Sequence, residues 1–280
     1  MTTNTKETAG PYLDLNDGHQ IPQLGFGVFQ VEPDETAEAV TRALDVGYRL
    51  IDTAAMYGNE AGVGEAINKS ELDRGDVFVT TKLANDAHGH DEALRAFDHS
   101  LEELGFDYVD LYLIHWPIPK NDLYVDTWRA LCELKESGRA RSIGVSNFLV
   151  EHLETIIDAT GEVPAVNQIE VHPQYQEQEL RRYLREHEIV PEAYSPLGQG
   201  GALKDEKITE IAKAHDRTPA QVVLRWHIQL GNVVIPKSVT PSRIEENFRI
   251  FDFELSDSEM EAIKELDAGQ RIGPDPKTFG

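Results

Sequence analysis

Ionisable side chains that can hold charge and move protons stand near the ends of successive apolar runs in the sequence. Asp52 ends one run, Lys82 lies at the end of the next, and His115 ends the run after that. Tyr57 follows closely on Asp52. Because an unsatisfied polar group inside an apolar strand costs free energy, core filling alone explains this recurrence poorly. We interpret these four residues as a site for chemistry that involves proton transfer.

The pattern of polar residues at the ends of apolar runs continues toward the C-terminus. Polar side chains lie in or just after the later runs: Ser146, Asn147, Asn167, Gln168, Tyr194, Ser195, Lys237 and Ser238. Each residue taken alone has an ordinary structural explanation, such as a hydrogen-bonded histidine for His115 or a snorkelling lysine for Lys82. Asp52 alone could be a helix cap. Their joint placement favours one shared functional site.

Apolar runs and helix-like segments alternate along the whole chain. Runs of strand type cover 24–29, 48–53, 77–83, 108–116, 142–146, 166–171, 189–194 and 232–236. Segments of helical periodicity cover 33–46, 60–68, 91–104, 122–137, 149–159, 176–187, 205–215 and 219–230. Several of the strands are apolar on both faces, which is typical of a parallel sheet covered by helices.

Eight strands that alternate with eight helices predict an α/β fold, a closed (β/α)8 TIM barrel. An open doubly wound sheet is the alternative. Residues 1–11 are expected to form a flexible tail, and residues 12–280 a single barrel domain, since no linker rich in Pro, Gly or Ser interrupts them. In such a barrel, chemistry takes place at the C-terminal ends of the strands, where the polar residues fall.

Two additions to the barrel are expected. The segment 13–21 reads as an N-terminal β-hairpin with Asp17 and Gly18 at its turn, placed as a plug across the bottom of the barrel. The segments 241–247 and 257–266 read as extra C-terminal helices.

The composition limits the partners of this protein. The 280 residues carry a formal net charge of −24, which repels nucleic acid and anionic membranes, so a phosphate-bearing ligand would need a local basic cluster. Cys132 is the only cysteine, so no intrachain disulfide can form. No apolar run is long enough to span a bilayer, and the polar N-terminus lacks the apolar core of a signal peptide. We expect a cytoplasmic protein, and a monomer because no unusual apolar surface stripe is evident.

Other motifs that carry chemistry are incomplete in this sequence. Gly25 and Gly27 begin a Gly-x-Gly-x-x-Gly pattern, but Gln30 stands at the third position, so the dinucleotide fingerprint of a Rossmann fold is missing. The segment 88–91, His-Gly-His-Asp, could hold a metal, yet a solvated loop leading into a helix cap explains it better. No metal site is therefore expected.

Four motifs, in order along the chain, point to a known family. The first is GYRLIDTAAMYGNE at 47–60, followed by LIHWP at 113–117 and GVSNF at 144–148. The last is IPKS at 235–238, with Arg243 and Asn247 after it. On these motifs the sequence resembles the aldo-keto reductase family, and within it the bacterial branch of 2,5-diketo-D-gluconate and methylglyoxal reductases. The four catalytic positions show no departure from the family pattern.

The resemblance implies NADPH/NADP+ as the cofactor, bound in an extended form across the top of the barrel. It implies contacts from these residues: Ser146, Asn147, Gln168, Tyr194, Ser195, Leu197, Lys237, Ser238, Arg243, Glu246 and Asn247. Tyr194 would stack on the nicotinamide, and Ser146, Asn147 and Gln168 would hold its carboxamide.

The other end of the cofactor would lie on the segment after the last strand. Lys237, Ser238 and Arg243 would hold the adenosine 2′-phosphate, and Glu246 with Asn247 would contact the adenine. Barrels of this kind favour a phosphate site after the last two strands. The alternative is that Lys237 and Arg243 form surface ion pairs with neighbouring glutamates.

The resemblance also implies a proton donor for carbonyl reduction, Tyr57. A free tyrosine has a pKa of about 10, and a neighbouring ammonium favours the phenolate, so Lys82 is expected to lower the pKa of Tyr57. Asp52 would hold Lys82 in place and keep it charged. His115 would orient the substrate oxygen through a hydrogen bond.

Apolar residues beside the catalytic positions are expected to line a pocket for small dicarbonyls, keto-sugars and simple or aromatic aldehydes: Val28, Phe29, Met56, Trp116 and Phe148. Two other functions remain open. One is a barrel isomerase or lyase for a phosphorylated sugar, which would need no nicotinamide. The other is an NADPH-binding accessory or structural protein with little turnover.

Overall fold

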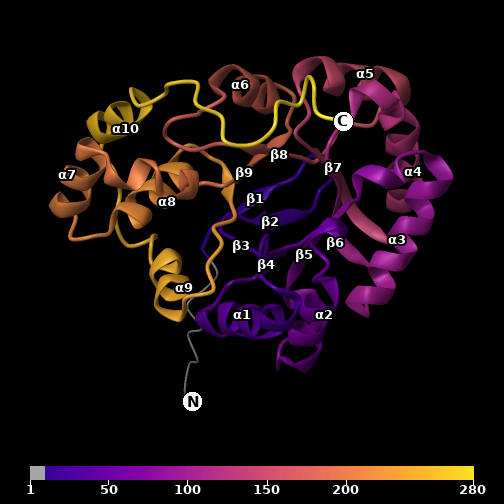
Figure 1. The fold of residues 1–280 in the computed structure, drawn as a ribbon, viewed down its shortest axis with the longest axis horizontal. Coiled ribbons are helices and arrows are strands. Elements are labelled where there is room, and N and C mark those ends of the chain that lie inside the picture. Colours follow the sequence, from indigo (N-terminus) through magenta and orange to yellow (C-terminus); the bar gives the residue numbers. More distant parts are fainter. Residues whose placement is uncertain (1–9) are drawn as a thin grey trace.

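The computed structural model describes residues 10–280 of the chain. Its centre is a sheet of eight parallel strands, ordered β3 to β10, and helices surround the sheet (Figure 1). The two ends of the sheet meet at Leu24 and Val234, which form a parallel bridge, and the Gly25 amide donates to the Val234 carbonyl oxygen at 2.9 Å. The sheet thus closes into a (β/α)8 barrel, which confirms the predicted fold and excludes the open doubly wound sheet.

The barrel strands are short, and most begin and end within two residues of the predicted runs. They are β3 (Phe26–Gly27), β4 (Leu50–Asp52), β5 (Phe78–Leu83), β6 (Val109–Ile114), β7 (Ala140–Ser146), β8 (Val166–Glu170), β9 (Val190–Tyr194) and β10 (Val233–Val234). The α-helices are α1 (Pro33–Val46), α2 (Glu60–Lys69), α3 (His90–Leu104), α4 (Tyr124–Glu136), α5 (Val150–Thr160), α6 (Gln178–Glu186), α7 (Glu206–Ala214), α8 (Pro219–Gln229), α9 (Pro241–Phe248) and α10 (Asp257–Lys264). The last two are the predicted C-terminal additions.

Local sequence signals explain where several helices begin and end. Pro33 opens α1 at the first helical position, where its missing amide hydrogen costs nothing. Gly47 ends α1 with a φ of 124°, a conformation that glycine adopts without strain, and its amide donates to carbonyl oxygens of the last turn. Thr218 and Gln221 form a capping box at the start of α8.

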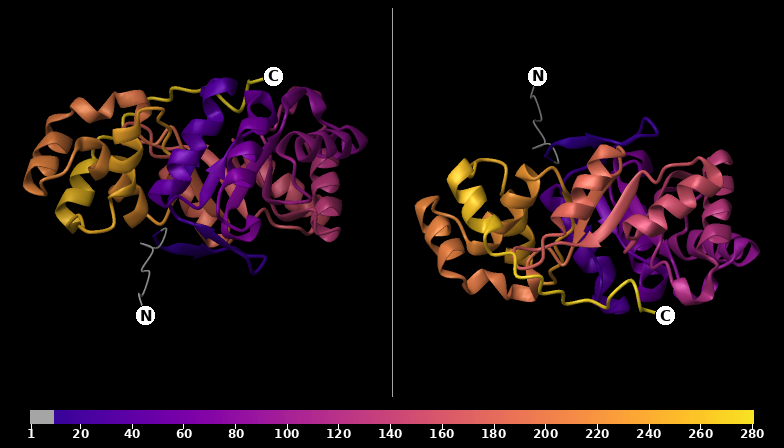
Figure 2. Two further views of the ribbon diagram at one scale, coloured as in Figure 1. Left: turned by 90° about the horizontal axis from the view of Figure 1, so that it is seen from below. Right: turned by 90° about the horizontal axis from the view of Figure 1, so that it is seen from above.

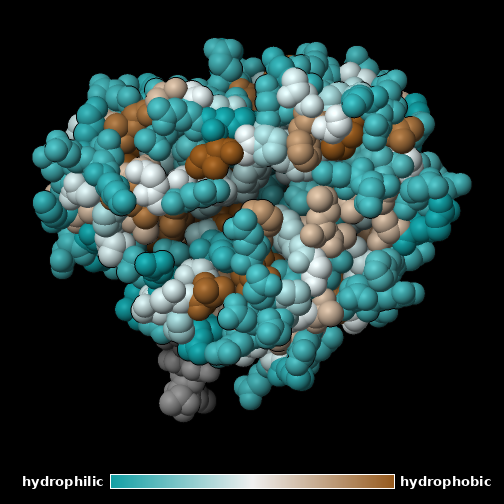
Figure 3. All heavy atoms as spheres, viewed as in Figure 1, coloured by the Kyte–Doolittle hydropathy of each residue, from teal (hydrophilic) through white to brown (hydrophobic). Residues whose placement is uncertain are grey.

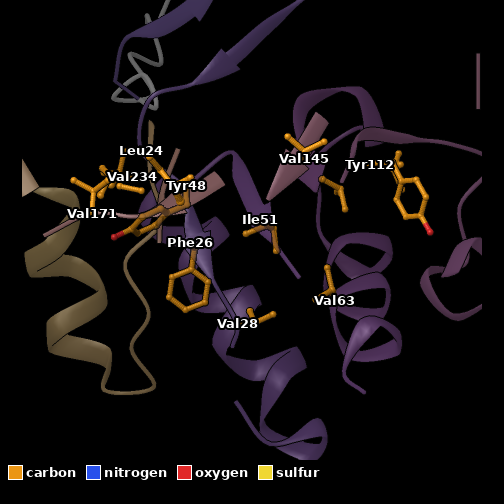
Figure 4. Packing of buried hydrophobic residues seen from close by; sticks show 14 of the residues in the cluster. Leu24, Phe26, Val28, Tyr48, Ile51, Val63, Tyr112, Val145, Val171 and Val234 are labelled. Carbon is orange, nitrogen blue, oxygen red and sulfur yellow. The ribbon is translucent and has the colours of Figure 1, made fainter. Parts of the chain in front are cut away.

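Two apolar clusters hold the barrel together. The larger one lies between the strands and the helices, where the ring of Tyr48 packs against Phe26 (Figure 4). The same ring also packs against Phe248. The smaller one fills the inside of the barrel: Leu15, Ile21, Leu50, Leu111, Leu113, Ala165, Val166, Val190, Val233 and Ile235. Since Leu15 and Ile21 belong to the N-terminal hairpin, the hairpin extends the interior core and closes the bottom of the barrel.

The hairpin pairs β1 (Tyr12–Asp14) with β2 (Gln20–Pro22) in antiparallel register, as predicted. Figure 2 shows it at the end of the barrel opposite the C-terminal segment. Residues 1–9 of the predicted tail lie outside the described residues, whereas the Pro11 carbonyl oxygen accepts a hydrogen bond from the Gln23 amide at 2.9 Å. Between residues 10 and 280, no helix combines the length and the apolar character needed to cross a membrane.

Candidate active site

A buried ion pair lies at the C-terminal ends of neighbouring strands. Lys82, at the end of β5, has no exposed surface, and its Nζ donates to both carboxylate oxygens of Asp52 at 2.8 Å. A third hydrogen bond of 2.8 Å goes to the Thr53 carbonyl oxygen. Burial lowers the pKa of Lys82, but Asp52 and Tyr57 raise it more, so the net shift is upward. Lys82 is therefore held in one position and kept charged, as the sequence predicted.

Tyr57 lies beside this pair. It ends the 3-10 helix η1 (Ala55–Tyr57), which directly follows β4, and its hydroxyl oxygen is 3.4 Å from Lys82 Nζ. Burial raises the pKa of Tyr57, and the neighbouring Lys82 lowers it by less, so the net shift is upward. The prediction that Lys82 lowers the pKa of Tyr57 overall is thus wrong for this structure. Desolvation of the phenolate outweighs the attraction of one ammonium group, whose charge Asp52 already partly neutralises.

His115 is the third group at the mouth of the barrel. Its ring centroid lies 5.7 Å from that of Tyr57 in an edge-on arrangement. Burial and, to a smaller extent, the Lys82 charge together lower the pKa of His115 to about 3, so the imidazole is neutral near neutral pH. Within residues 10–280, its buried Nδ1 has no hydrogen-bond partner. A neutral imidazole carries one N–H, which it can donate to a substrate oxygen.

The residues predicted to hold the nicotinamide lie together around these groups. The Ser146 hydroxyl donates to the Gln168 carbonyl oxygen at 2.9 Å, and Asn147 Nδ2 donates to the His115 carbonyl oxygen at 3.0 Å. The Tyr194 hydroxyl donates to Asn147 Oδ1 at 2.8 Å. Gln168 Nε2 donates to Asp52 Oδ2 at 2.8 Å, which joins this set to the Lys82 pair.

Two residues of the predicted cofactor site adopt a strained backbone conformation. Asn147 follows β7 with a φ of 63°, and Ser195 follows β9 with a φ of 47°. Residues other than glycine rarely adopt positive φ angles, and such strain gathers at functional sites. Leu197 comes two residues later, just before a 3-10 helix at Gly198–Gly200.

The predicted phosphate-binding residues form a basic cluster at the start of α9. Both Lys237 and Arg243 are exposed, and neither has a carboxylate oxygen within 4.0 Å among residues 10–280. Glu245 pairs instead with Arg249 at 3.8 Å, and Glu246 accepts a hydrogen bond from the Thr218 hydroxyl at 2.8 Å. Among the described residues, Lys237 and Arg243 therefore do not form the surface ion pairs with these glutamates that were the alternative.

Ser238 and Asn247 flank the basic cluster. Both side chains are buried, and Ser238 Oγ accepts a hydrogen bond from the Thr240 amide at 3.1 Å. This bond lies in the turn that leads into α9, with Lys237 just before the turn and Arg243 in the first turn of the helix.

Four of the five predicted pocket residues divide into two groups. Phe29 and Met56 are each 53% exposed, and they flank Tyr57 in space or in sequence, with the Phe29 and Tyr57 rings 5.0 Å apart. Val28 and Phe148 have no exposed surface and belong to the core behind the site. The prediction is corrected for these two residues, because a fully buried side chain presents no surface to a substrate.

The sequence did not indicate a contact from the C-terminal segment. The Phe279 ring packs on Trp116 at a centroid distance of 4.5 Å, so the end of the chain reaches the predicted pocket. Figure 3 shows this face of the molecule hollowed near its centre, beside the C-terminal segment. The only feature of the sequence that could have indicated this contact is that Phe279 is an aromatic residue in a polar C-terminal segment.

A second buried carboxyl group near the site, that of Glu192, was also not predicted from the sequence. Glu192 lies in β9 and has no exposed surface. Burial and, to a smaller extent, the Asp52 charge raise the pKa of Glu192 to about 8, against the opposing effects of the Gln168 amide and the Lys82 ammonium. The signal that could have found it is an acidic residue inside the otherwise apolar run IVPEAY.

Comparisons with known proteins agree with this geometry. A profile of the Aldo/keto reductase family matches residues 23–268. An aldo-keto reductase of Mycobacterium sp. (strain KMS) is 56% identical over 269 residues, which cover 96% of this chain and 98% of that protein.

This chain belongs to the aldo/keto reductase family.

Two further relatives show how close the match is within the family. The methylglyoxal reductase DkgA of Yersinia pestis is 52% identical and covers 98% of this chain and 99% of its own length. The crystal structure of a Gox0644 mutant in complex with NADPH superimposes with a TM-score of 0.94 at 51% identity, over 97% of this chain and 99% of that one. Because it belongs to this family, the protein is an oxidoreductase, and the alternative of an isomerase or lyase is excluded.

Proposed function

We propose that this aldo-keto reductase reduces aldehydes and ketones to alcohols with NADPH, and that Tyr57 is the general acid of the reaction. The observation that carries the proposal is the Tyr57 hydroxyl 3.4 Å from Lys82 Nζ, in a buried cluster that Asp52 anchors. The NADPH in the related Gox0644 structure and the methylglyoxal reductases among the relatives support the same reaction class.

The residues around the barrel mouth fit NADPH. Lys237 and Arg243 offer positive charge that no carboxylate among residues 10–280 neutralises, at the start of a helix, where a phosphate is favoured. Ser146 and Asn147 place amide and hydroxyl groups near His115 and Gln168. When bound, NADPH supplies the hydride.

The side chains of this protein handle the proton. As negative charge grows on the substrate oxygen, the Tyr57 hydroxyl donates its proton to that oxygen. The Lys82 ammonium stabilises the tyrosinate that remains, and Asp52 prevents Lys82 from losing its own charge. The neutral His115 imidazole donates a hydrogen bond that orients the substrate oxygen.

The exposed pocket residues favour small substrates with an activated carbonyl. Phe29 and Met56 present apolar surface next to Tyr57, and Trp116 with Phe279 forms an aromatic wall. These walls suit methylglyoxal, keto-sugars and aromatic aldehydes. The test is NADPH oxidation with methylglyoxal, phenylglyoxal, a nitrobenzaldehyde and a diketo-sugar acid. Tight NADPH binding without turnover of any of them would instead indicate an accessory or structural role.

Replacing Arg243 with Ala is expected to weaken the binding of NADPH about ten- to a hundredfold, which is the effect of losing hydrogen bonds to a charged group. NADH, which lacks the 2′-phosphate, should change little. The measurement is the KM for each cofactor at saturating carbonyl. Arg249→Ala is the matched control, because Arg249 is exposed near the same helix but pairs with Glu245. Equal losses for NADPH and NADH would remove Arg243 from the phosphate site.

A further inference from the structure

Glu192 lies inside the barrel, in the same layer as the ion pair. Side chains two residues apart on a strand share a face, and Val190, two residues before Glu192, belongs to the interior cluster. The same relation holds for Asp52 after Leu50 and for Gln168 after Val166. Asp52, Gln168 and Glu192 therefore all point inward, one layer above the apolar interior.

The strand register places Glu192 next to Gln168. These two residues are Cα partners across β8 and β9, and Val233 is the partner of Glu192 on β10. Gln168 in turn donates to Asp52 Oδ2 at 2.8 Å. Only Gln168 therefore separates Glu192 from the Asp52–Lys82 pair, and it lies between the two carboxyl groups.

The charges around Glu192 do not balance if it ionises. The titratable groups that act on it are Asp52 from β4 and Lys82 from β5, while its neighbour on β10 is apolar. Both oxygens of Asp52 are bonded to Lys82, whereas neither oxygen of Glu192 has a hydrogen-bond partner within residues 10–280. A buried carboxylate without a counter-charge is costly, so Glu192 keeps its proton.

We propose that Glu192 is a positioning residue of this active site: its buried carboxyl, joined to the Asp52–Lys82 pair through Gln168, controls how strongly Lys82 acts on the Tyr57 hydroxyl. The proposal rests on the proposed function of Tyr57. Once ionised, Glu192 adds a negative charge beside Lys82, and the pKa of Tyr57 rises because the phenolate becomes less stable. Tyr57 would then remain a proton donor to higher pH than Lys82 and Asp52 alone allow.

The first test needs no turnover. Thermal unfolding midpoints of the wild type and Glu192→Gln are compared from pH 4.5, the ordinary glutamate value, to above pH 8. Folded Glu192 keeps its proton up to about pH 8 and unfolded Glu192 loses it near 4.5, so the unfolded state binds fewer protons across this window. The wild type is expected to lose stability relative to Glu192→Gln as the pH rises, with no further loss above the window. Parallel curves would overturn the proposal.

Glu170→Gln is the matched control. Glu170 is another fully buried glutamate, at the end of β8, but its oxygens accept from the Ile272 and Gly273 amides, and the net shift of its pKa is downward. Folded Glu170 loses its proton below the ordinary glutamate value, so its linkage to stability lies below this window, and the midpoints of Glu170→Gln and the wild type are expected to run parallel from about pH 5 upward. If Glu192→Gln does not fold, Asp52→Asn replaces it: without the Asp52 charge, Lys82 can pair with Glu192, so the Glu192 transition should move to lower pH.

The second test is the pH profile of carbonyl reduction. The alkaline limb of Glu192→Gln is expected at lower pH than that of the wild type by about one unit, a common size for a charge effect in proteins. A loss of rate that is uniform across the profile, or superimposable profiles, would show a merely structural role and overturn the proposal. If the wild type reduces no carbonyl, the proposed reaction fails, while the unfolding comparison still decides whether Glu192 holds a proton.

Discussion

Tyr57→Phe is expected to lower the turnover of carbonyl reduction by about a hundredfold to ten-thousandfold, the range of a lost general acid. The hydroxyl at 3.4 Å from Lys82 Nζ is the group within the cluster that can release a proton and leave a stabilised anion. NADPH affinity should change much less, because the phenyl ring remains. Steady-state turnover and cofactor binding by fluorescence measure the two effects separately.

Tyr112→Phe is the matched control for this substitution. Tyr112 is fully buried against Phe97, and within residues 10–280 its hydroxyl has no hydrogen-bond partner. The same chemical change there should leave turnover intact. Near-normal turnover of Tyr57→Phe would exclude Tyr57 as the proton donor, whatever the control does.

Lys82→Met is expected to cost about 3–5 kcal/mol in the free energy of unfolding and to abolish most turnover. Its removal leaves the Asp52 carboxylate, 2% exposed, without its counter-charge, and breaking one side of a buried ion pair has costs of this size. Chemical denaturation at neutral pH measures the loss of stability, and the carbonyl assay measures the loss of turnover.

The double variant Lys82→Met with Asp52→Asn separates stability from chemistry. With the uncompensated charge removed, much of the lost stability should return, since a neutral amide is far cheaper to bury than a carboxylate. Turnover should remain low, because no ammonium acts on Tyr57. Recovery of turnover together with stability would mean that Lys82 serves only the fold.

The sequence predicted the elements and the ion pair well because the signals for both are local. Pro33 and Gly47 mark the ends of α1 within the segment itself, and α1 spans the predicted residues. Asp52 and Lys82 end adjacent parallel strands, so the topology of the barrel alone brings them together.

The features that the sequence did not predict depend on the surroundings in three dimensions. Whether Phe148 faces the pocket or the core depends on how the chain turns after β7, and in the structure its side chain is fully buried in the core. The net direction of the Tyr57 pKa depends on a balance between burial and charge that no motif encodes. Phe279 and Glu192 enter the site from distant positions, which only the folded chain brings together.

The most direct test of the central claim is product analysis with NADPH that carries deuterium at the transferable position of the nicotinamide. Incubation with methylglyoxal or phenylglyoxal should convert the carbonyl to an alcohol with deuterium on the new carbinol carbon, in step with NADP+ formation. The same incubation with Tyr57→Phe should give little product. An alcohol without deuterium, or no alcohol from any carbonyl while NADPH binds tightly, would contradict hydride transfer from NADPH as the function of this chain.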